Sequence, residues 1–432
     1  MTNHLSAQIH AIGRAARAAS RVLATSSTET KNAALLGMAD QLLANQSEIL
    51  AANALDLESG EKNGLSAAML DRLKLDEKRL ATMADGVRTA ATLPDPVGRI
   101  LREWEKENGL SFRKISVPIG VIGIIYESRP NVTSDAAVLC LKAGNACILR
   151  GGSEAIHSNR AIASALQSGI RTAGLPEACV QLIQVTDRSV VRILCEMDEF
   201  LDCLIPRGGK GLVETVADHA RMPVIKHLDG LCSLYVDKFA DLAMARTIIL
   251  NGKVQRPGVC NAVETLLLHR DIAAAFLAEG GQALLEKGVQ LRCDQTTLLL
   301  FQDYSPTLKA GYSKLIQEAS EADFDTEFLD LILAVKVVDS VEEAINHIEI
   351  HGSRHSDAIV TADAGAAELF LNSVDSAPVY WNASTRFNDG GEFGFGCEIG
   401  ISTVKLHARG PVGLEELTSY KYQIRGSGQI RV

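Results

Sequence analysis

The stretch PIGVIGIIYESRPNVTSDAAVLCLKAGNACILRGGSEA, residues 118–155, decides the fold. Short apolar runs at Val117–Tyr126 and Ala146–Arg150 predict two strands, and the segment between them predicts a helix. Short, continuously apolar strands that alternate with helices are typical of a parallel sheet covered on both faces. The stretch therefore predicts a doubly wound α/β domain.

The same alternation continues along the chain, after a helical N-terminal region. Further strands of the first series are expected at Val180–Val185, Leu201–Pro206 and Pro223–His227. A second series follows, with strands expected at Cys232–Val236, Thr265–His269, Thr297–Phe301, Leu331–Val338 and Asp357–Thr361, and helices near Asp241–Asn251 and Asp271–Lys287. The sequence thus predicts two α/β lobes in succession.

A hairpin is expected around Asn108-Gly109, because both residues tolerate the positive φ of a two-residue turn. Its arms, REWEKE and LSFRKISV, are polar with partial alternation, so the hairpin either pairs with another subunit or forms an ordinary sheet edge. The final segment, EELTSYKYQIRGSGQI, predicts a strand that could pair with this hairpin.

The composition is that of a globular protein, with 47% hydrophobic and 22% charged residues among 432. That length favours two or three domains. The net charge of −10 argues against a nucleic-acid or anionic-membrane partner, which would need a basic excess. The longest apolar stretch, Val117–Tyr126, is too short to span a membrane. The polar N-terminus, and nine cysteines with no CxxC pair, predict a reduced, cytoplasmic protein.

Cys260 is the candidate nucleophile among these cysteines. Most of the others lie in apolar runs and are interpreted as packing residues. Cys260, in QRPGVCNAVETLLLH, follows the turn-forming pair Pro257-Gly258, and Arg256 nearby favours the reactive thiolate. A packing role for Cys260 is the alternative.

Glycine-rich turns suggest phosphate binding. RGGKG, residues 207–211, and RGGSEA, residues 150–155, each follow an expected strand and open an expected helix. Backbone N–H groups at such a helix N-terminus suit a phosphate. Neither stretch is a GxGxxG or Walker motif, so a merely tight turn is the alternative.

Two further stretches carry polar chemistry. In HIEIHGSRHSD, His347 and His351 have the spacing of zinc ligands, but Gly352 interrupts the helix before His355 and no ligand pattern is completed, so we expect no metal. The second stretch, NASTRFNDGGEFGFG, residues 382–396, offers donors and acceptors for a small polar molecule, with a solvated loop as the alternative.

These stretches, together with HARGPVGLEELT, resemble the aldehyde dehydrogenase superfamily and, within it, the γ-glutamyl phosphate reductase family. The resemblance implies an aldehyde dehydrogenase-like α/β fold. It further implies a cofactor-binding lobe of residues 1–97 and 118–228 and a catalytic lobe of residues 229–396. Residues 98–117 and 410–432 would form an oligomerisation hairpin and C-terminal strand. The site would lie between the lobes.

The implied activity is NADPH-dependent reduction of L-glutamyl 5-phosphate to L-glutamate 5-semialdehyde and phosphate, the second step of proline biosynthesis. Cys260 would form the thioester intermediate. Its backbone N–H and the Asn131 side chain would stabilise the oxyanion, although Glu127 occupies the ungapped position of the superfamily's asparagine. Oxidising members carry a hydrolytic Glu where KHLDG places His227 or its neighbour, which favours reduction over aldehyde oxidation. A non-catalytic binding protein of the same fold is the other alternative.

The resemblance also implies binding residues. Arg150 matches the lysine at the adenosine ribose, and Ser153 stands where NAD-preferring members often carry Glu, a combination that suits a 2′-phosphate, whereas Glu154 next door opposes it. The other cofactor-binding candidates are Gly208, Gly209, Gly211 and Glu327. The substrate-binding candidates are Arg129, Arg256, Arg386 and Asp389, with Glu392 as a second choice for the substrate ammonium. Expected partners are further copies of the chain, as a dimer or tetramer, and a glutamate 5-kinase.

Overall fold

The computed structural model describes residues 2–226, 229–304 and 311–431, which divide into two compact units. Unit 1 comprises Met1–Lys226, Gly390–Gly400 and Leu406–Val432, and unit 2 comprises His227–Asp389 and Ile401–Lys405. The hairpin and C-terminal strand thus group with unit 1, and so do residues 390–396, which we expected in the catalytic lobe. The roles expected of the two lobes stay predictions.

Unit 1 is built around a parallel sheet of order β5-β4-β3-β6. Its strands are β3 (Val121–Tyr126), β4 (Ala146–Arg150), β5 (Val180–Leu182) and β6 (Cys203–Arg207). Its helices are α1 (Thr2–Leu23), α2 (Thr28–Ala44), α3 (Gln46–Lys62), α4 (Ala67–Leu73), α5 (Glu77–Thr92), α6 (Asn131–Lys142), α7 (Ile156–Thr172), α8 (Ser189–Cys195) and α9 (Lys210–His219). Short 3-10 turns lie at η1 (Ser153–Ala155) and η2 (Glu177–Cys179).

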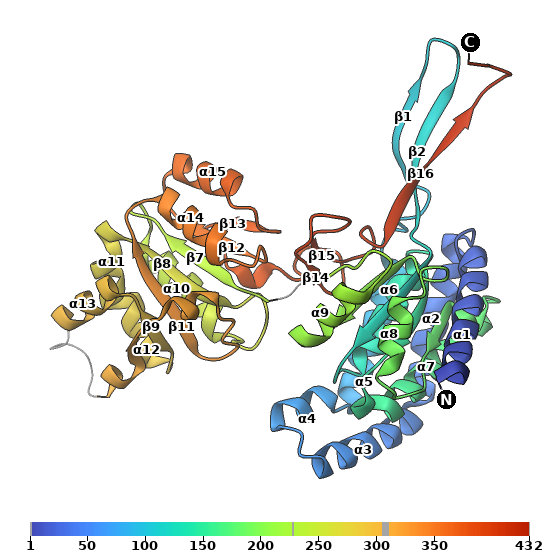
Figure 1. Ribbon diagram of the computed structural model, residues 1–432, viewed down its shortest axis with the longest axis horizontal. Coiled ribbons are helices and arrows are strands. Elements are labelled where there is room, and N and C mark those ends of the chain that lie inside the picture. The colour runs from blue at the N-terminus through green and yellow to red at the C-terminus, as the bar shows by residue number, and fades with distance from the viewer. Residues whose placement is uncertain (1, 227–228, 305–310, 432) are drawn as a thin grey trace. The chain divides into compact units, whose positions relative to one another are not determined.

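Both faces of this sheet are covered, as the apolar strands predict. β3 is buried at every residue. Ile122 and Ile124 pack in a cluster with α2, α5, α6 and α7, whereas Val121 and Ile125 pack with α1, α8 and α9. Figure 1 shows the strands of this sheet surrounded by these helices. The prediction of a doubly wound α/β domain is confirmed.

A three-stranded arm extends from unit 1 in Figure 1. It pairs β1 (Ile100–Glu105), β2 (Ser111–Pro118) and β16 (Thr418–Arg425) in antiparallel order β1-β2-β16. Gly109 takes φ +80° in the turn between β1 and β2, a conformation that glycine adopts without strain. The predicted hairpin, and its pairing with the final strand, are therefore confirmed.

Unit 2 contains a seven-stranded parallel sheet of order β10-β9-β11-β8-β7-β12-β13. The strands are β7 (Cys232–Val236), β8 (Val263–His269), β9 (Gln290–Cys293), β10 (Ile316–Glu318), β11 (Ile332–Val338), β12 (Asp357–Val360) and β13 (Val379–Trp381). The helices are α10 (Leu242–Val254), α11 (Arg270–Phe276), α12 (Gln282–Glu286), α13 (Gln295–Tyr304), α14 (Val341–His351) and α15 (Ala364–Ser373). Shorter elements of unit 2 are η3 (Leu277–Gly281), η5 (Tyr312–Leu315), η6 (Glu321–Asp325), η7 (Thr385–Phe387) and the strand β14 (Ile401–Ser402), whereas the strand β15 (Gly410–Pro411) belongs to unit 1.

Two predicted strands are wrong. Thr297–Phe301 belongs to helix α13, where Leu299 is half exposed and Phe301 is buried, so the apolar run has one buried side. The missed signal is Asp294, whose side chain accepts the Thr297 N–H at 2.9 Å, as an N-cap residue does. Of the strand expected at Pro223–His227, the described residues 223–226 form an isolated bridge between Val224 and Leu204 and no extended ladder, and proline at the first position cannot donate to one.

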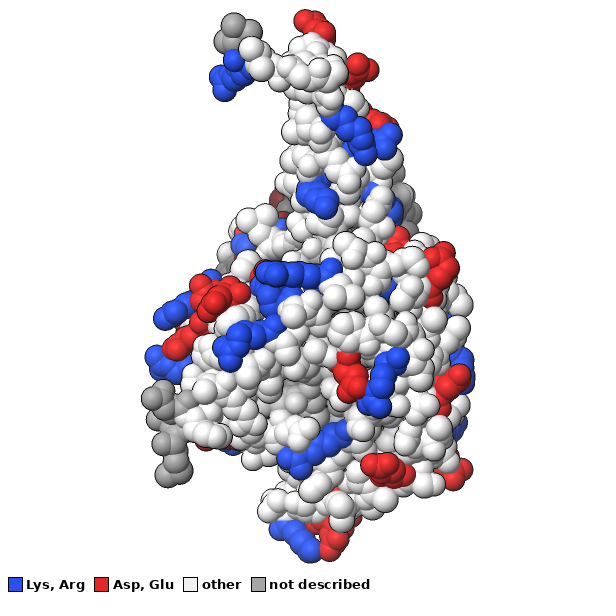
Figure 2. All heavy atoms as spheres, turned by 90° about the vertical axis from the view of Figure 1, so that its right-hand side faces the viewer, with Lys and Arg blue, Asp and Glu red and all other residues white. Residues whose placement is uncertain are grey.

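The surface carries both signs of charge. On the face drawn in Figure 2, Lys and Arg side chains are interspersed with Asp and Glu. No helix among the described residues is long and apolar enough to cross a membrane.

Candidate active site

Cys260 lies in unit 2 on the loop between α10 and β8, residues 255–262, which we call the nucleophile loop. Its thiol is half buried, whereas seven of the other cysteines are buried and Cys397 is half buried. Burial raises the pKa of Cys203 and Cys397 to about 12, so these thiols stay protonated at neutral pH. Cys260 therefore occupies the position best suited to a nucleophile within the described chain.

The backbone around Cys260 is tightly held. The Cys232 thiol donates to the Cys260 carbonyl at 3.3 Å, and a Cβ built on Gly230 would lie 2.0 Å from that same oxygen. Any side chain at position 230 would displace the nucleophile loop. Glycine is required here by close backbone approach.

Three of the predicted substrate-binding residues, Arg256, Arg386 and Asp389, lie in the same unit as Cys260. Burial lowers the pKa of Arg386, the charge of Arg256 lowers it further, and Cys260 and Asp389 act in the opposite direction. Each of these groups is therefore close enough to Arg386 to change its ionisation. The Arg386 Nε donates to Gln255 at 3.0 Å.

The element η7 that carries Arg386 packs against the nucleophile loop. The Thr385 hydroxyl donates to the Asn261 carbonyl at 2.7 Å, and the Asn261 side-chain amide donates to the Asn388 carbonyl at 3.0 Å. These two bonds fix the arginine relative to the cysteine. The nucleophile loop with Cys260 and Arg256 is thus held against the element that carries Arg386, and two guanidinium groups in one place suit an anion.

The predicted nicotinamide-ribose residue, Glu327, lies on another segment next to this loop. It is half buried, and its charge is one of the factors that raise the pKa of Glu264. Leu329, two residues later, has φ +56°, and its carbonyl oxygen lies 3.5 Å from where a Cβ of Gly258 would stand. The structure thus places the Glu327 segment beside the nucleophile loop.

The histidine stretch forms a packed cluster. His351 Nδ1 lies 2.9 Å from Asp325 Oδ1, and the His347 and His351 rings are 4.5 Å apart. Burial lowers the pKa of His347 to about 3. His355 is buried behind the nucleophile loop, 3.6 Å from the Cys232 sulfur. Over residues 2–226, 229–304 and 311–431, no group of three or more His, Cys, Asp or Glu could hold a metal.

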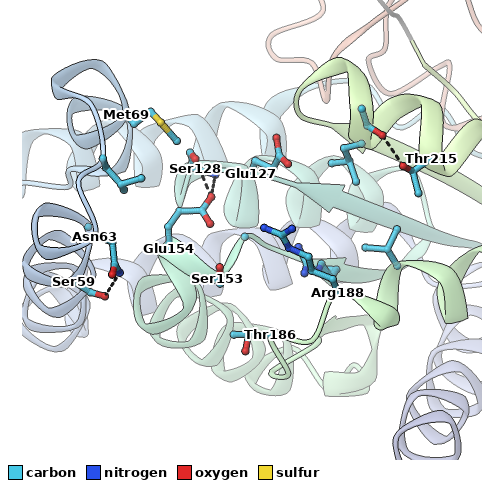
Figure 3. Close-up of a pocket in the computed structure, with 17 residues that line it drawn as sticks. Ser59, Asn63, Met69, Glu127, Ser128, Ser153, Glu154, Thr186, Arg188 and Thr215 are labelled. Atoms are coloured by element: carbon cyan, nitrogen blue, oxygen red, sulfur yellow. Dashed lines mark hydrogen bonds between the residues drawn. The ribbon is translucent and has the colours of Figure 1, made fainter. Parts of the chain in front are cut away.

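Unit 1 contains a cavity of about 850 Å³, shown in Figure 3. Three of the predicted cofactor residues line it: Arg150, Ser153 and Gly211. Gly208 and Gly209 lie at the end of β6 next to it, and the Gly209 N–H donates to the Glu127 carboxylate at 2.9 Å. Glu127 therefore acts as an acceptor here, which does not suit an oxyanion donor.

Glu154 is the residue whose negative charge would oppose binding of a 2′-phosphate. In the structure its carboxylate is hydrogen-bonded to Ser128. Its carboxylate accepts the Ser128 N–H at 2.6 Å and the Ser128 hydroxyl at 2.8 Å, as the dashed lines of Figure 3 mark. Ser128 takes φ +46° to make these contacts. Both donors of Ser128 thus satisfy the negative charge of Glu154.

Thr186 and Arg188 are among the cavity residues that the sequence did not indicate. They follow β5, which pairs with β4, so the carboxyl ends of both strands reach the cavity. Burial lowers the pKa of Arg150, and the positive charge of Arg188 contributes to the lowering. The signal was an Arg just after an expected strand, the position at which open α/β sheets bind ligands.

Asn131 and Arg129 lie in unit 1, at the start of α6 and just before it, and both are exposed. The Asn131 side-chain amide donates to Asp135 at 2.8 Å, and burial raises the pKa of Asp135 to about 6. Their proposed roles stay predictions. His227 lies outside the described residues.

Comparison with known proteins places these observations in a family. The model of the aldehyde dehydrogenase family matches residues 1–297. The chain belongs to the aldehyde dehydrogenase family. It is 52% identical to gamma-glutamyl phosphate reductase of Clostridium tetani, covering 97% of each chain. It is 53% identical to the same enzyme of Moorella thermoacetica, covering 98% of this chain and 99% of the relative.

A solved structure agrees. The crystal structure of gamma-glutamyl phosphate reductase from Thermotoga maritima is similar with a TM-score of 0.93 and 44% identity, covering 98% of this chain and 99% of that one. The predicted resemblance and the aldehyde dehydrogenase-like α/β fold are therefore confirmed. The chain is an oxidoreductase of a family that uses nicotinamide cofactors.

Proposed function

We propose that the chain reduces L-glutamyl 5-phosphate to L-glutamate 5-semialdehyde and phosphate, with NADPH as reductant and a thioester on Cys260 as intermediate. The observation that carries the proposal is the half-buried Cys260 with Arg256, Arg386 and Asp389 around it. The close relatives named gamma-glutamyl phosphate reductase support the substrate and its place as the second step of proline biosynthesis.

The Cys260 thiolate attacks the acyl carbonyl, an S–C bond forms, and the C–O bond to phosphate breaks so that phosphate leaves with its electron pair. When bound, NADPH supplies the hydride that reduces the thioester. The Cys260 sulfur then leaves with the C–S bonding electrons as the carbonyl re-forms, which regenerates the thiolate and releases the aldehyde. The Cys260 N–H, with Asn131 as the second donor, stabilises negative charge on the carbonyl oxygen.

The charged neighbours bind and orient the substrate. Arg256 and Arg386 neutralise its phosphate and carboxylate, because guanidinium groups form paired hydrogen bonds with both anions. Asp389 binds the ammonium, and Arg129 remains a candidate for a second anionic contact. The KHLDG stretch offers no Glu at the superfamily's hydrolytic position, so the thioester is kept for reduction.

The cavity of unit 1 fits the adenosine 2′-phosphate of NADPH. Arg150 Nε is buried and lacks a hydrogen-bond partner within the described part of the chain. A bound anion would satisfy it. Ser153 and Arg188 add a hydroxyl and a second positive charge, while Glu154 is bound to Ser128. Gly208, Gly209 and Gly211 allow close approach of the cofactor, and Glu327 holds its nicotinamide ribose.

The arm supports self-association. Ile100, Leu101, Tyr420, Tyr422 and Ile424 are each about half exposed on it, and exposed apolar patches of this kind mark protein interfaces. We propose a dimer or tetramer joined through this arm. The glutamate 5-kinase partner and the cytoplasmic location stay predictions.

The test is the reverse reaction, with glutamate 5-semialdehyde, phosphate and NADP⁺. We expect NADPH formation that depends strictly on phosphate, since the thioester must be released by phosphate and not by water. Rapid oxidation of the semialdehyde or of simple aliphatic aldehydes without phosphate would contradict the proposal and favour an aldehyde-oxidising dehydrogenase.

A further inference from the structure

A buried ion pair joins the two ends of the nucleophile loop. Lys253 lies in the last turn of α10, and Glu264 is the second residue of β8. The Lys253 Nζ lies 2.6 Å from the Glu264 carboxylate, and the two side chains are 0% and 1% exposed. The segment between them contains Cys260, so this contact closes the loop at its base.

The same carboxylate reaches a second segment. The other Glu264 oxygen accepts the Leu329 N–H at 3.4 Å. Leu329 holds φ +56°, a conformation unfavourable for a residue with a branched side chain, and its carbonyl lies against Gly258 of the nucleophile loop. Glu264 thus connects the loop that carries Cys260 with the segment that carries Glu327.

A contribution to folding stability does not by itself explain this ion pair. Burial raises the pKa of Glu264 and lowers that of Lys253, because removal from water disfavours both charges. Their mutual attraction opposes these shifts, while Glu327 adds a repulsive charge to Glu264. Apolar residues of similar volume at such positions often give equal or greater folding stability. The buried charges therefore need another explanation.

We propose that Lys253 and Glu264 are positioning residues: they fix the spacing between the Cys260 thiol and the Glu327 segment. The inference rests on the proposed function for the roles of Cys260 and Glu327. Loosening the base of the loop lets the thiol sample orientations in which attack on the acyl carbon is slower, and small errors of this kind are costly in catalysis. Substrate binding by Arg256 and Arg386 would be affected less.

The experiment uses the full chain with two variants. Lys253→Met/Glu264→Leu replaces the pair with apolar residues, and Glu264→Gln keeps an acceptor for Leu329 but removes the charge. For each we measure the unfolding midpoint, kcat, KM for the acyl phosphate, and the rate of Cys260 alkylation by iodoacetamide, located by peptide mass spectrometry. Alkylation needs neither substrate nor cofactor, so it tests positioning even if the proposed reaction is wrong.

The matched control is Lys31→Met, which breaks another buried ion pair, Lys31 with Asp95 at 2.6 Å in unit 1. We expect it to lower the unfolding midpoint without changing kcat or Cys260 alkylation. We expect both pair variants to lower kcat at least tenfold, with KM within threefold of the wild type, and to change the alkylation rate at least threefold. Glu264→Gln should lose less activity than the double variant.

The proposal is overturned if folded pair variants keep the wild-type kcat and alkylation rate, because the pair would then be structural only. Should the double variant not fold, Glu264→Gln alone decides between the two results. If the wild type shows no phosphate-dependent activity at all, the proposed function fails, and the alkylation rates still decide the positioning role.

Discussion

Replacement of Arg188 by Ala tests whether the cavity of unit 1 recognises the 2′-phosphate of NADPH. Arg188 lines the cavity beside Arg150, and its positive charge already influences Arg150. A hydrogen bond to a charged group contributes about 1.5–3 kcal/mol. Arg188 is exposed to water, which places it at the lower end, about 1.5 kcal/mol. Since about 1.4 kcal/mol is tenfold, Arg188→Ala should lower kcat/KM for NADPH about tenfold.

The assay compares NADPH with NADH, which lacks the 2′-phosphate. We expect kcat/KM for NADH to change less than twofold, so that the NADPH/NADH preference falls about tenfold. The control is Arg192→Ala, an exposed arginine on α8 that pairs with Glu196 at 3.2 Å and does not line the cavity. Equal losses with both cofactors, or an unchanged preference, would refute the assignment.

Three other predictions test the site and the core. Cys260→Ala should retain the wild-type unfolding midpoint and NADPH binding by fluorescence titration, and lose at least ~10³-fold in kcat; near-normal turnover would exclude the thioester mechanism. Gly230→Ala should lower the free energy of unfolding by about 1–3 kcal/mol and kcat with it, because its Cβ meets the Cys260 carbonyl, whereas Gly86→Ala in α5, with nothing within 4 Å, should not destabilise; equal effects would be contrary to this reasoning. Burial raises the pKa of Asp357 to about 6 from 3.8, so the folded state holds the proton more tightly, and the wild type should lose about 2 kcal/mol of unfolding free energy as the pH rises from 4 to 6, a loss that Asp357→Asn should not show. Urea unfolding across that range measures it, and parallel pH profiles would contradict it.

The regular parts of the fold could be predicted because their signals are local. Strands β3 and β4 are short apolar runs, and the β1–β2 turn contains Asn108-Gly109. The strand predicted at Thr297–Phe301 was wrong because it, too, relied on a local signal alone. A run of apolar residues fits a buried strand or one side of a helix equally well. Only the N-cap at Asp294 distinguishes the two here.

The residues of the candidate site that lie close together in the sequence could be predicted from it. Cys260 and Arg256 lie four residues apart, and the turn between them is visible in the sequence. Arg188 was missed because its closeness to Arg150 depends on the pairing of β4 with β5. Lys253 and Glu264 were missed because charged residues are rarely buried, and only the packing of α10 and β8 removes them from water.

The arm can be completed only late in the synthesis of the chain. Strand β2 pairs with β16, whose residues lie about 300 positions later in the chain. At about 5–20 residues per second, a ribosome needs roughly 15–60 s to deliver that strand. During this interval the hairpin has one open side, and a lysine on β2, Lys114, is a residue of the kind that discourages pairing with a neighbouring chain. The association through the arm that we propose would therefore follow the pairing of β16 with β2, which separates folding of each arm from its association.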